Sequence, residues 1–350
     1  MIQYVLNKYG IKEAEIKPFG NGLINHTWII KTGADTYILQ QINHQIFKKP
    51  TLIAENIKLI SDFLILHHPQ YLFVSPIQTL DKKDTVFIEA EGYYRIFPFV
   101  KNSHTVDVVL NLNEAYEASK QFGRFTKLLN TFNSEKLHIT LPDFHNLSLR
   151  YSQFETALEL GNKERILEAS KIIIFLKAQK YIASDFEKIC TNNQFKKRVT
   201  HHDTKISNVL LDEKNRGLCV IDLDTVMPGY FISDVGDMMR TYLSPVSEEE
   251  KDFSKIEIRA PYFKAIADGY LSEMKDELSK DEKSHFIYAG KFMIYMQALR
   301  FITDYLNDDV YYGAKYEGQN FIRGGNQVVL LQKLIECENE LQHLLDNILI

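Results

Sequence analysis

The chain has few of the features that mark secreted, membrane or disulfide-rich proteins. Its 350 residues include only three cysteines, Cys190, Cys219 and Cys337, which are odd in number and widely spaced, so neither a disulfide framework nor a structural zinc site is indicated. No stretch approaches the roughly 18 apolar residues of a membrane span, and the first residues lack a charged head followed by a long apolar core. We therefore expect a soluble protein of the reducing cytoplasm with no membrane partner.

An excess of positive charge is also missing. Lys and Arg number 41 against 46 Asp and Glu, which gives a net charge of −5. Nonspecific nucleic-acid binding needs a positive field, so nucleic acid is excluded as an expected partner. Apolar residues make up 45% of the chain, enough to fill the core of one large domain or two lobes.

The apolar pattern changes near residue 100. Before it, β-branched and aromatic runs predict strands, interrupted by one long helix that starts after Pro50 with Thr51 as its N-cap. The predicted strands include 37–39, 72–74, 85–88 and 93–96, and the predicted later helices are 112–130, 146–160, 163–188, 281–307 and 326–348, with a capping box at Ser279 and Glu282. The sequence thus predicts an α+β, bilobal protein with a sheet lobe over 1–100 and a larger, mainly helical lobe over 101–350.

A strand pattern returns inside the helical region, at about 199–226. The turn residues 213–217 separate two apolar runs and predict a β-hairpin. If residue 212 pairs with residue 218, Asn208 faces Asp222 at the open end, beside the loop that carries Asp203. An amide oxygen and a carboxylate suit Mg²⁺, which completes its shell with phosphate oxygens and water. The alternative is an ordinary hairpin with polar ends.

The spacing of polar residues in this segment resembles the catalytic and metal-binding loops of protein-kinase-like phosphotransferases. The matching pattern is His201-x-Asp203-x-Lys205-x-x-Asn208, followed by Asp222 on the returning strand. The resemblance implies that Asp203 accepts the proton of the substrate hydroxyl and that Asn208 and Asp222 hold Mg²⁺. It also implies that Lys205 lies near the transferred phosphoryl group, and that His201 braces the loop. The small N-terminal sheet is then expected to be antiparallel.

Two glycines near the N-terminus stand where a kinase glycine-rich loop is expected. Gly20 and Gly22 are at a turn between two predicted strands, where backbone can approach phosphates, although plain turn chemistry explains them equally well. The following strand departs from the protein-kinase pattern, because Gln40 stands where a phosphate-pairing lysine is expected. Glu55, in the next helix, is either a partner of Gln40 or a solvated helix-face residue.

The segment at the junction of the two predicted lobes is the candidate adenine site. Phe97, Phe99 and Val100 can offer backbone groups to adenine and apolar side chains to its ring. A buried strand end is the alternative. With Gly20, Gly22 and Gln40, these residues form the predicted ATP-binding set.

Segments from both lobes resemble the N-acetylhexosamine 1-kinases, a group within the aminoglycoside phosphotransferase and choline kinase-like superfamily. These are bacterial enzymes that phosphorylate the anomeric hydroxyl of N-acetylglucosamine or N-acetylgalactosamine. The resemblance implies ATP as co-substrate, Mg²⁺ as cofactor and a small sugar as acceptor, and the glutamine at position 40 is shared by this group. The matching segments are 21–25, 37–44, 202–205, 220–229 and 299–306.

The last of these segments offers sugar-binding chemistry. Arg300 and Asp304 are four residues apart on a predicted helix, and Tyr311 follows, so guanidinium, carboxylate and an aromatic ring are available. The resemblance favours Arg300 and Tyr311 as sugar contacts, and a helix-surface ion pair between Arg300 and Asp304 is the alternative. Asp224 either orients the acceptor or a second metal ion, or braces the residues after it.

Two other functions compete with a sugar kinase. The first is a kinase for another small alcohol, such as an aminoglycoside, choline or homoserine, although cationic acceptors need a pocket lined by carboxylates, and Arg300 would repel them. The second is a non-catalytic nucleotide-binding module, suggested by the missing lysine at Gln40. Asp234 and Asp237, farther along, are expected to cap and anchor the next helix.

Overall fold

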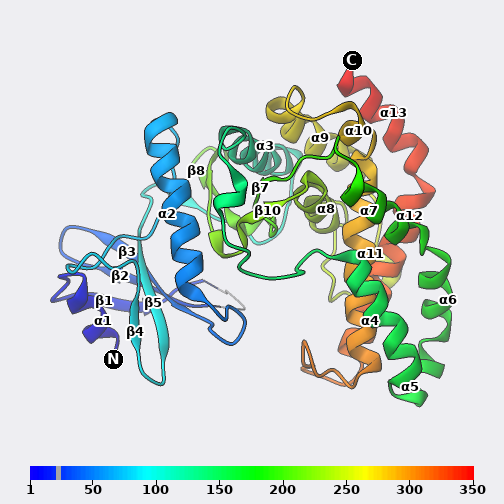
Figure 1. Ribbon diagram of the computed structural model, residues 1–350, viewed down its shortest axis with the longest axis horizontal. Coiled ribbons are helices and arrows are strands. Elements are labelled where there is room, and N and C mark those ends of the chain that lie inside the picture. The colour runs from blue at the N-terminus through cyan, green and yellow to red at the C-terminus, as the bar shows by residue number, and fades with distance from the viewer. Residues whose placement is uncertain (21–24) are drawn as a thin grey trace.

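The computed structural model describes residues 1–20 and 25–350 and has two lobes (Figure 1). The N-terminal lobe is an antiparallel sheet in the order β1-β2-β3-β5-β4 with one long helix beside it, as the sequence predicts. The short strands β7, β8 and β10 lie between this sheet and the helices of the C-terminal lobe (Figure 1). The elements of the N-terminal lobe are α1 (Ile2–Lys8), β1 (Glu15–Pro18), β2 (His26–Lys31), β3 (Thr36–Ile42), α2 (Pro50–His67), β4 (Val86–Ile88) and β5 (Gly92–Pro98).

Helix α2 packs through one apolar stripe. Ile53, Ile57, Ile60 and Leu64 recur at helical spacing and are buried in a core that continues into the C-terminal lobe. The predicted N-cap was wrong by two residues, because the helix begins at Pro50 after Lys49. Proline suits a first helical position, where its missing N–H has no intrahelical partner to lose.

The sheet has a second, smaller core on its other side. Leu39 of β3 and Ile96 of β5 are register partners and are both fully buried, and they pack with Val5 and Leu6 of α1. The strand predicted at 72–74 was wrong. This segment is irregular and pairs with no strand of the sheet.

The C-terminal lobe is mainly helical. Its helices are α3 (Leu112–Leu128), α4 (Leu147–Leu160), α5 (Lys163–Glu168), α6 (Ser170–Ala178), α7 (Tyr181–Thr191), α8 (Phe231–Tyr242), α9 (Ala260–Met274), α10 (Lys280–Ser284), α11 (Phe286–Leu306), α12 (Gln319–Glu336) and α13 (Glu338–Leu349). Its strands are β6 (Ser103–His104), β7 (Arg198–Thr200), β8 (Val209–Asp212), β9 (Gly217–Val220) and β10 (Met227–Gly229), and its short 3-10 turns are η1 (Ser134–Lys136), η2 (Ile206–Asn208), η3 (Leu223–Thr225) and η4 (Phe253–Lys255).

Three predicted helices are divided in the structure. The predicted helix over 163–188 is α5, α6 and α7, and the one over 281–307 is α10 and α11, separated at His285. The predicted capping box at Ser279 and Glu282 is present at the start of α10. The helix predicted over 326–348 starts earlier, at Gln319, and is divided into α12 and α13 at Cys337.

The hairpin forms, but in another register than predicted. Val209 pairs with Val220 and Leu210 with Cys219, after which the register shifts and Leu211 pairs with Gly217. The shift is a β-bulge, which places one extra residue in the returning strand. The predicted pairing of residues 212 and 218 was therefore wrong.

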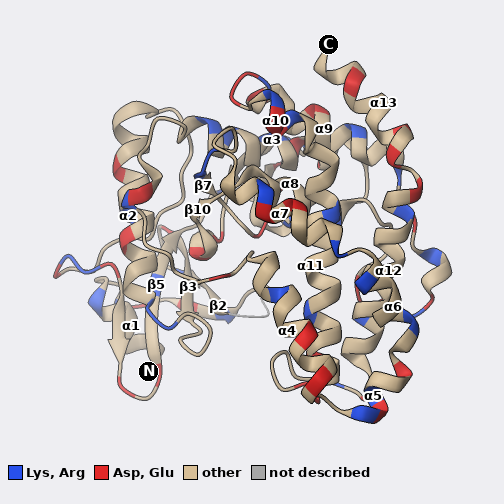
Figure 2. Ribbon diagram, turned by 45° about the vertical axis from the view of Figure 1, so that its right-hand side comes forward, with Lys and Arg blue, Asp and Glu red and all other residues tan. Residues whose placement is uncertain are grey.

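Charged side chains of both signs are interspersed along the helices and loops (Figure 2). Within the part of the chain that the structure describes, no helix combines the length and the apolar character needed to cross a bilayer.

Candidate active site

The loop between β7 and β8 is fixed by two carboxylates of α8. Oδ2 of Asp234 accepts a hydrogen bond from the amide of His201 (3.0 Å) and its Oδ1 accepts one from the amide of His202 (2.8 Å). Three residues along the helix, Oδ2 of Asp237 accepts the amide of Thr204 (2.8 Å). These two side chains therefore hold the backbone on both sides of the intervening aspartate.

This role differs from the one expected for Asp234 and Asp237. The N-cap of α8 is Tyr230, and no side chain caps this helix end. Burial raises the pKa of Asp234 to about 7, and the two backbone amides that it binds act against this rise. Residues three apart on a helix lie on one face, so both carboxylates point toward the same loop. They therefore anchor that loop and not the end of the helix.

His201 braces the loop from the other side. Its Nε2 lies 2.9 Å from the carbonyl oxygen of Ile221, and its ring meets Phe122 edge to face at 5.1 Å. The contact joins the loop to the segment that follows β9, which is the kind of contact expected for this histidine.

Asp203 projects from the anchored loop, with partners at both carboxylate oxygens. The Nζ of Lys205 lies 3.1 Å from Oδ1, and the side-chain amide of Asn208 donates to Oδ2 at 3.1 Å. Burial acts to raise the pKa of Asp203, but the combined influence of Lys205, His201 and Arg240 outweighs it, so the pKa lies below the usual value. The Asp203 side chain is 24% exposed and that of Lys205 is 49% exposed, so both remain open to a substrate.

The hairpin places Asn208 opposite Ile221 and not opposite Asp222, so the predicted facing of Asn208 and Asp222 was wrong by one residue. The amide of Ile221 donates to the carbonyl oxygen of Asn208 at 2.9 Å, so Asn208 faces Ile221 and Asp222 is the next residue. Asp222 adopts a left-handed conformation, with φ of 59°, and its side chain is exposed. The turn therefore directs its carboxylate away from the ladder and into the space beside Asp203.

The donor set around Asp222 fits a hard cation. Although Asp222 is exposed at the surface, the protein around it desolvates its carboxylate and, together with the charges of Asp224 and Asp203, raises its pKa to about 7. Mutually repelling carboxylates beside an amide oxygen are stabilised by Mg²⁺, which also takes oxygens from phosphate and water. Over 1–20 and 25–350, no three His, Cys, Asp or Glu side chains form a metal cluster by themselves. Asn208 and Asp222 thus suit an ion that arrives with a nucleotide.

Asp224 binds residues of the N-terminal lobe. The side-chain amide of Asn25 donates to its Oδ2 at 2.9 Å, and Nη1 of Arg95 lies 2.5 Å from its Oδ1. Asp224 is 1% exposed. Of the two roles left open by the sequence, this geometry favours bracing, because both carboxylate oxygens already have partners.

Of the predicted ATP-binding residues, Gln40 and Phe97 lie on the neighbouring strands β3 and β5 of the sheet. Gly20 has φ of 75° and no neighbour within 4 Å of an added Cβ, while Gly22 lies outside the described residues. Phe97 lies under the guanidinium of Arg95, with 4.9 Å to the ring centroid. Phe99 and Val100 follow β5 in the connection to β6, and both are half-buried.

Glu55 does not bind Gln40. Its carboxylate pairs with Nε2 of His138 at 2.7 Å, and Gln40 instead accepts hydrogen bonds from Arg95. The neighbouring Asn56 is buried and donates to the carbonyl oxygens of His138 (2.9 Å) and Val226 (3.2 Å). Helix α2 is thus joined to the C-terminal lobe through these contacts.

Arg300 and Tyr311 are brought together, as predicted. Nη2 of Arg300 lies 3.5 Å from the hydroxyl oxygen of Tyr311. The guanidinium lies 5.4 Å from the ring centroid of Tyr312 and 5.9 Å from that of Phe144. An arginine among three aromatic rings combines hydrogen-bond donors with apolar faces.

Asp304 requires a correction. Its Oδ1 accepts the amide of Tyr311 (2.7 Å), and its Oδ2 accepts the amide of Tyr312 (2.9 Å) and the side-chain amide of Asn320 (3.1 Å). The side chain is buried, is not paired with Arg300, and has three of its roughly four acceptor positions filled by the protein. Asp304 supports the loop that carries Tyr311.

Arg300 and the rings of Phe144, Tyr311 and Tyr312 form a cluster, called here the Arg300 cluster. Phe144 and His145, which the sequence did not single out, connect this cluster to the loop of Asp203. The ring of His145 stacks on Phe144 at 4.4 Å and lies 5.2 Å from that of His202, next to Asp203. Burial, together with His202 and Arg300, holds the pKa of His145 well below its usual range, which keeps its ring neutral. A chain of ring contacts therefore connects Arg300 to His202, the residue before the predicted base.

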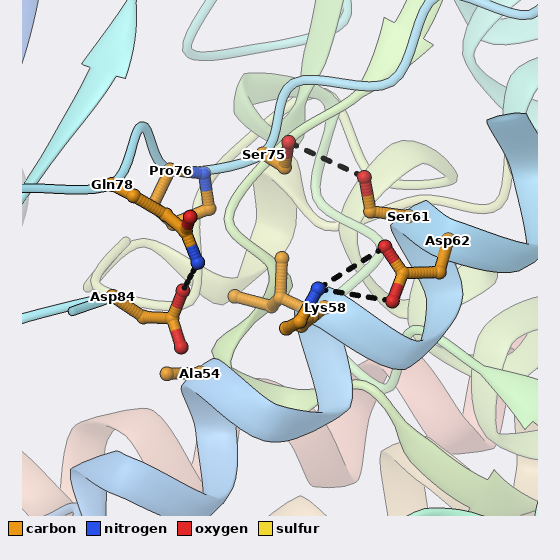
Figure 3. Close-up of a pocket in the computed structure, with 9 residues that line it drawn as sticks. Ala54, Lys58, Ser61, Asp62, Ser75, Pro76, Gln78 and Asp84 are labelled. Atoms are coloured by element: carbon orange, nitrogen blue, oxygen red, sulfur yellow. Dashed lines mark hydrogen bonds and ion pairs between the residues drawn. The ribbon is translucent and has the colours of Figure 1, made fainter. Parts of the chain in front are cut away.

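A cavity of about 160 Å³ on α2 is unrelated to this site (Figure 3). Its polar side chains bind one another, as Lys58 does with Asp62 and Gln78 with Asp84. None of the predicted site residues lines it.

Comparison with known proteins identifies a broader family than the N-acetylhexosamine 1-kinases. Residues 15–274 match the phosphotransferase enzyme family, and the chain belongs to that family. Solved structures with a similar fold include a microcompartment-associated aminopropanol kinase (14% identity, 97% of each chain, TM-score 0.64). A spectinomycin phosphotransferase in complex with ADP and spectinomycin is also similar (14% identity, 96% of this chain and 97% of that chain, TM-score 0.62). So is a choline kinase from Cryptosporidium parvum (13% identity, 97% and 96%, TM-score 0.59).

Proposed function

We propose that the protein is an ATP- and Mg²⁺-dependent kinase that phosphorylates the anomeric hydroxyl of N-acetylglucosamine or N-acetylgalactosamine. The observation that supports the proposal is the series of ring contacts that runs from Arg300 through Phe144 and His145 to His202, the residue before Asp203. The family membership supports phosphoryl transfer, and a fold neighbour that holds ADP supports a nucleotide donor.

Asp203 is the residue that receives the proton. Its carboxylate accepts the proton of the anomeric hydroxyl while the sugar oxygen forms a bond to the γ-phosphorus and the bond to the β-γ bridging oxygen breaks, which releases ADP. Lys205, 3.1 Å from Asp203, is exposed enough to turn toward the phosphoryl group and offset its charge. Asn208 and Asp222 would hold Mg²⁺, which when bound neutralises charge on the phosphate oxygens.

The acceptor region disfavours a cationic alcohol. Arg300 already presents its charge to the rings of Phe144, Tyr311 and Tyr312, the faces that an ammonium group would otherwise use. A second cation there would meet repulsion. A neutral sugar can instead accept hydrogen bonds from the guanidinium and place its apolar face on a tyrosine ring.

A kinase for another small alcohol is the second candidate. It is favoured by the fold likeness to an aminopropanol kinase, a spectinomycin phosphotransferase and a choline kinase. The difference between the two candidates lies in the charge of the acceptor, so one experiment separates them.

The test is an acceptor panel with ATP and Mg²⁺, followed by ADP release. We expect turnover with N-acetylglucosamine or N-acetylgalactosamine, and a product whose phosphorus couples to the anomeric proton in NMR. The methyl glycoside of the same sugar is the matched control, because it lacks only the anomeric hydroxyl and should give no product. Turnover with choline, ethanolamine, aminopropanol or homoserine and none with either sugar would overturn the proposal.

A further inference from the structure

Gln40 of β3 and Arg95 of β5 form a cross-strand pair in the centre of the N-terminal sheet. They are register partners, and Nε (3.1 Å) and Nη2 (2.8 Å) of Arg95 both donate to Oε1 of Gln40. Two donors on one oxygen fix the orientation of the glutamine amide and hold the guanidinium plane in place.

The same guanidinium reaches the C-terminal lobe. Its Nη1 lies 2.5 Å from Oδ1 of Asp224, while Asn25 donates to Oδ2 at 2.9 Å. Asn25 is itself held, because its Oδ1 accepts the amide of Asn43 at 3.0 Å. A carboxylate of one lobe thus has both oxygens bound by side chains of the other.

The ion pair between Arg95 and Asp224 is buried, so neither charge can be left without its partner. The side chains of Arg95 and Asp224 are each 2% exposed. A buried charge without its partner is strongly disfavoured, so each of the two side chains constrains the other. Phe97, whose ring centroid lies 4.9 Å from the guanidinium, restricts Arg95 further.

The pair gives a physical reason for glutamine at position 40. A lysine there would place a second cation against the guanidinium of Arg95, whereas an amide oxygen accepts both of its N–H groups. Glu55, the possible partner from α2, is bound to His138 instead. Gln40 and Glu55, which stand at the positions of the strand lysine and helix glutamate of the protein-kinase pattern, are thus both otherwise engaged, and Arg95 of β5 supplies the cation.

We propose that Arg95 is a positioning residue that joins the lobes at Asp224 and thereby holds Asp222, two residues earlier, where Mg²⁺ and nucleotide bind. The 3-10 turn η3 (Leu223–Thr225) links the two aspartates, and Asp222 enters it in a left-handed conformation. Movement of Asp224 is therefore transmitted directly to Asp222. The inference rests on the phosphotransfer site proposed above but not on the identity of the acceptor.

The test measures ATP affinity by calorimetry, with Mg²⁺ and with EDTA, and needs no acceptor. We expect Mg²⁺ to tighten ATP binding to the natural protein, and we expect Arg95→Gln to reduce that Mg²⁺-dependent gain by about tenfold or more while metal-free affinity changes little. Arg95→Lys, which returns a charge without the planar fork, should recover part of the gain. Arg216→Gln is the control, because Arg216 forms an exposed ion pair with Asp212.

A purely structural role for Arg95 predicts a different result. The melting temperature would fall while the Mg²⁺-dependent gain of the folded protein stayed at the natural value, and this outcome would overturn the proposal. If Arg95→Gln does not fold, Gln40→Leu tests the same link, because it removes the acceptor of the guanidinium and leaves the ion pair with Asp224. We expect a smaller loss of the gain in that variant, and an unchanged gain would also overturn the proposal. A protein that binds Mg²⁺ and ATP normally but fails to phosphorylate either sugar refutes only the acceptor assignment.

Discussion

The ammonium nitrogen of Lys205 lies 3.1 Å from Oδ1 of Asp203. Burial would favour the protonated acid, but Lys205, His201 and Arg240 together reverse this effect and lower the pKa of Asp203 below its usual value. The carboxylate is therefore ionised at neutral pH and able to receive a proton. The same pair keeps Lys205 close to the place where phosphoryl charge develops.

Replacement of Asp203 by Asn is expected to lower kcat by about 10²- to 10⁴-fold, because the proton acceptor is lost while the shape is kept. Binding of ATP should persist, since Asn208 and Asp222 are unchanged. Steady-state kinetics and calorimetry on the same preparation check this. A binding-only module would show no turnover before the change and none after it, and substantial turnover by Asp203→Asn would contradict the assigned role.

Asp304 is expected to act on acceptor binding through the loop it supports. Asp304→Asn places an NH₂ group where the amides of Tyr311 or Tyr312 now donate, so the loop should loosen and KM for the acceptor should rise, with ATP affinity unchanged. Asp308→Asn is a matched control in the same loop, because Asp308 is exposed. Equal effects of the two changes would argue against the supporting role.

The local parts of the site could be predicted from the sequence, because they depend on spacing along a few residues. The loop of Asp203 and Asn208 and its return to Asp222 are of this kind, as is the stripe of α2. The contact of Arg95 with Asp224 could not be predicted, since it joins segments far apart in the chain. The only indication in the sequence was that Arg95 stands in the otherwise apolar run 93–96, and this did not identify Asp224 as its partner.

The errors have equally specific causes. The hairpin register depended on a bulge at Leu218, and bulges have no simple residue signature. Asp304 and Arg300 have the spacing of an ion pair, but backbone amides of the following loop compete for the carboxylate. The sequence predicted that Asp234 and Asp237 cap the helix that follows. Their actual partners, the backbone amides of the loop of His201, are about 30 residues away in the chain, so no local pattern indicated them.

Acidification is expected to destabilise the fold through His202. Burial lowers its pKa from 6.5 to about 4, with the neighbouring His201 acting in the same direction and the carbonyls of Thr200 and Thr225 against it; the ring of His145 lies 5.2 Å away. The unfolded chain binds this proton below pH 6.5 and the folded chain only near pH 4, so this contribution to stability is lost as the pH falls from 6.5 to about 4. His202→Asn tolerates the φ of 67° and should flatten the dependence of melting temperature on pH over this range. An unchanged slope in that variant would show that other groups account for it.

Helices α8 and α11 approach each other closely at Gly236. A Cβ added there would lie 2.2 Å from the carbonyl oxygen of Ala289 and 2.9 Å from Cβ of Met293, so neither contact can be relieved by a flexible side-chain end. We expect Gly236→Ala to lower the free energy of unfolding by about 1–3 kcal/mol, because the helices must separate, and to lower activity as α8 carries the residues that anchor the catalytic loop. Gly33→Ala is the matched control, since an added Cβ there meets nothing within 4 Å. Denaturant unfolding of both variants checks the difference, and equal stability of the two would contradict the packing described for α8 and α11.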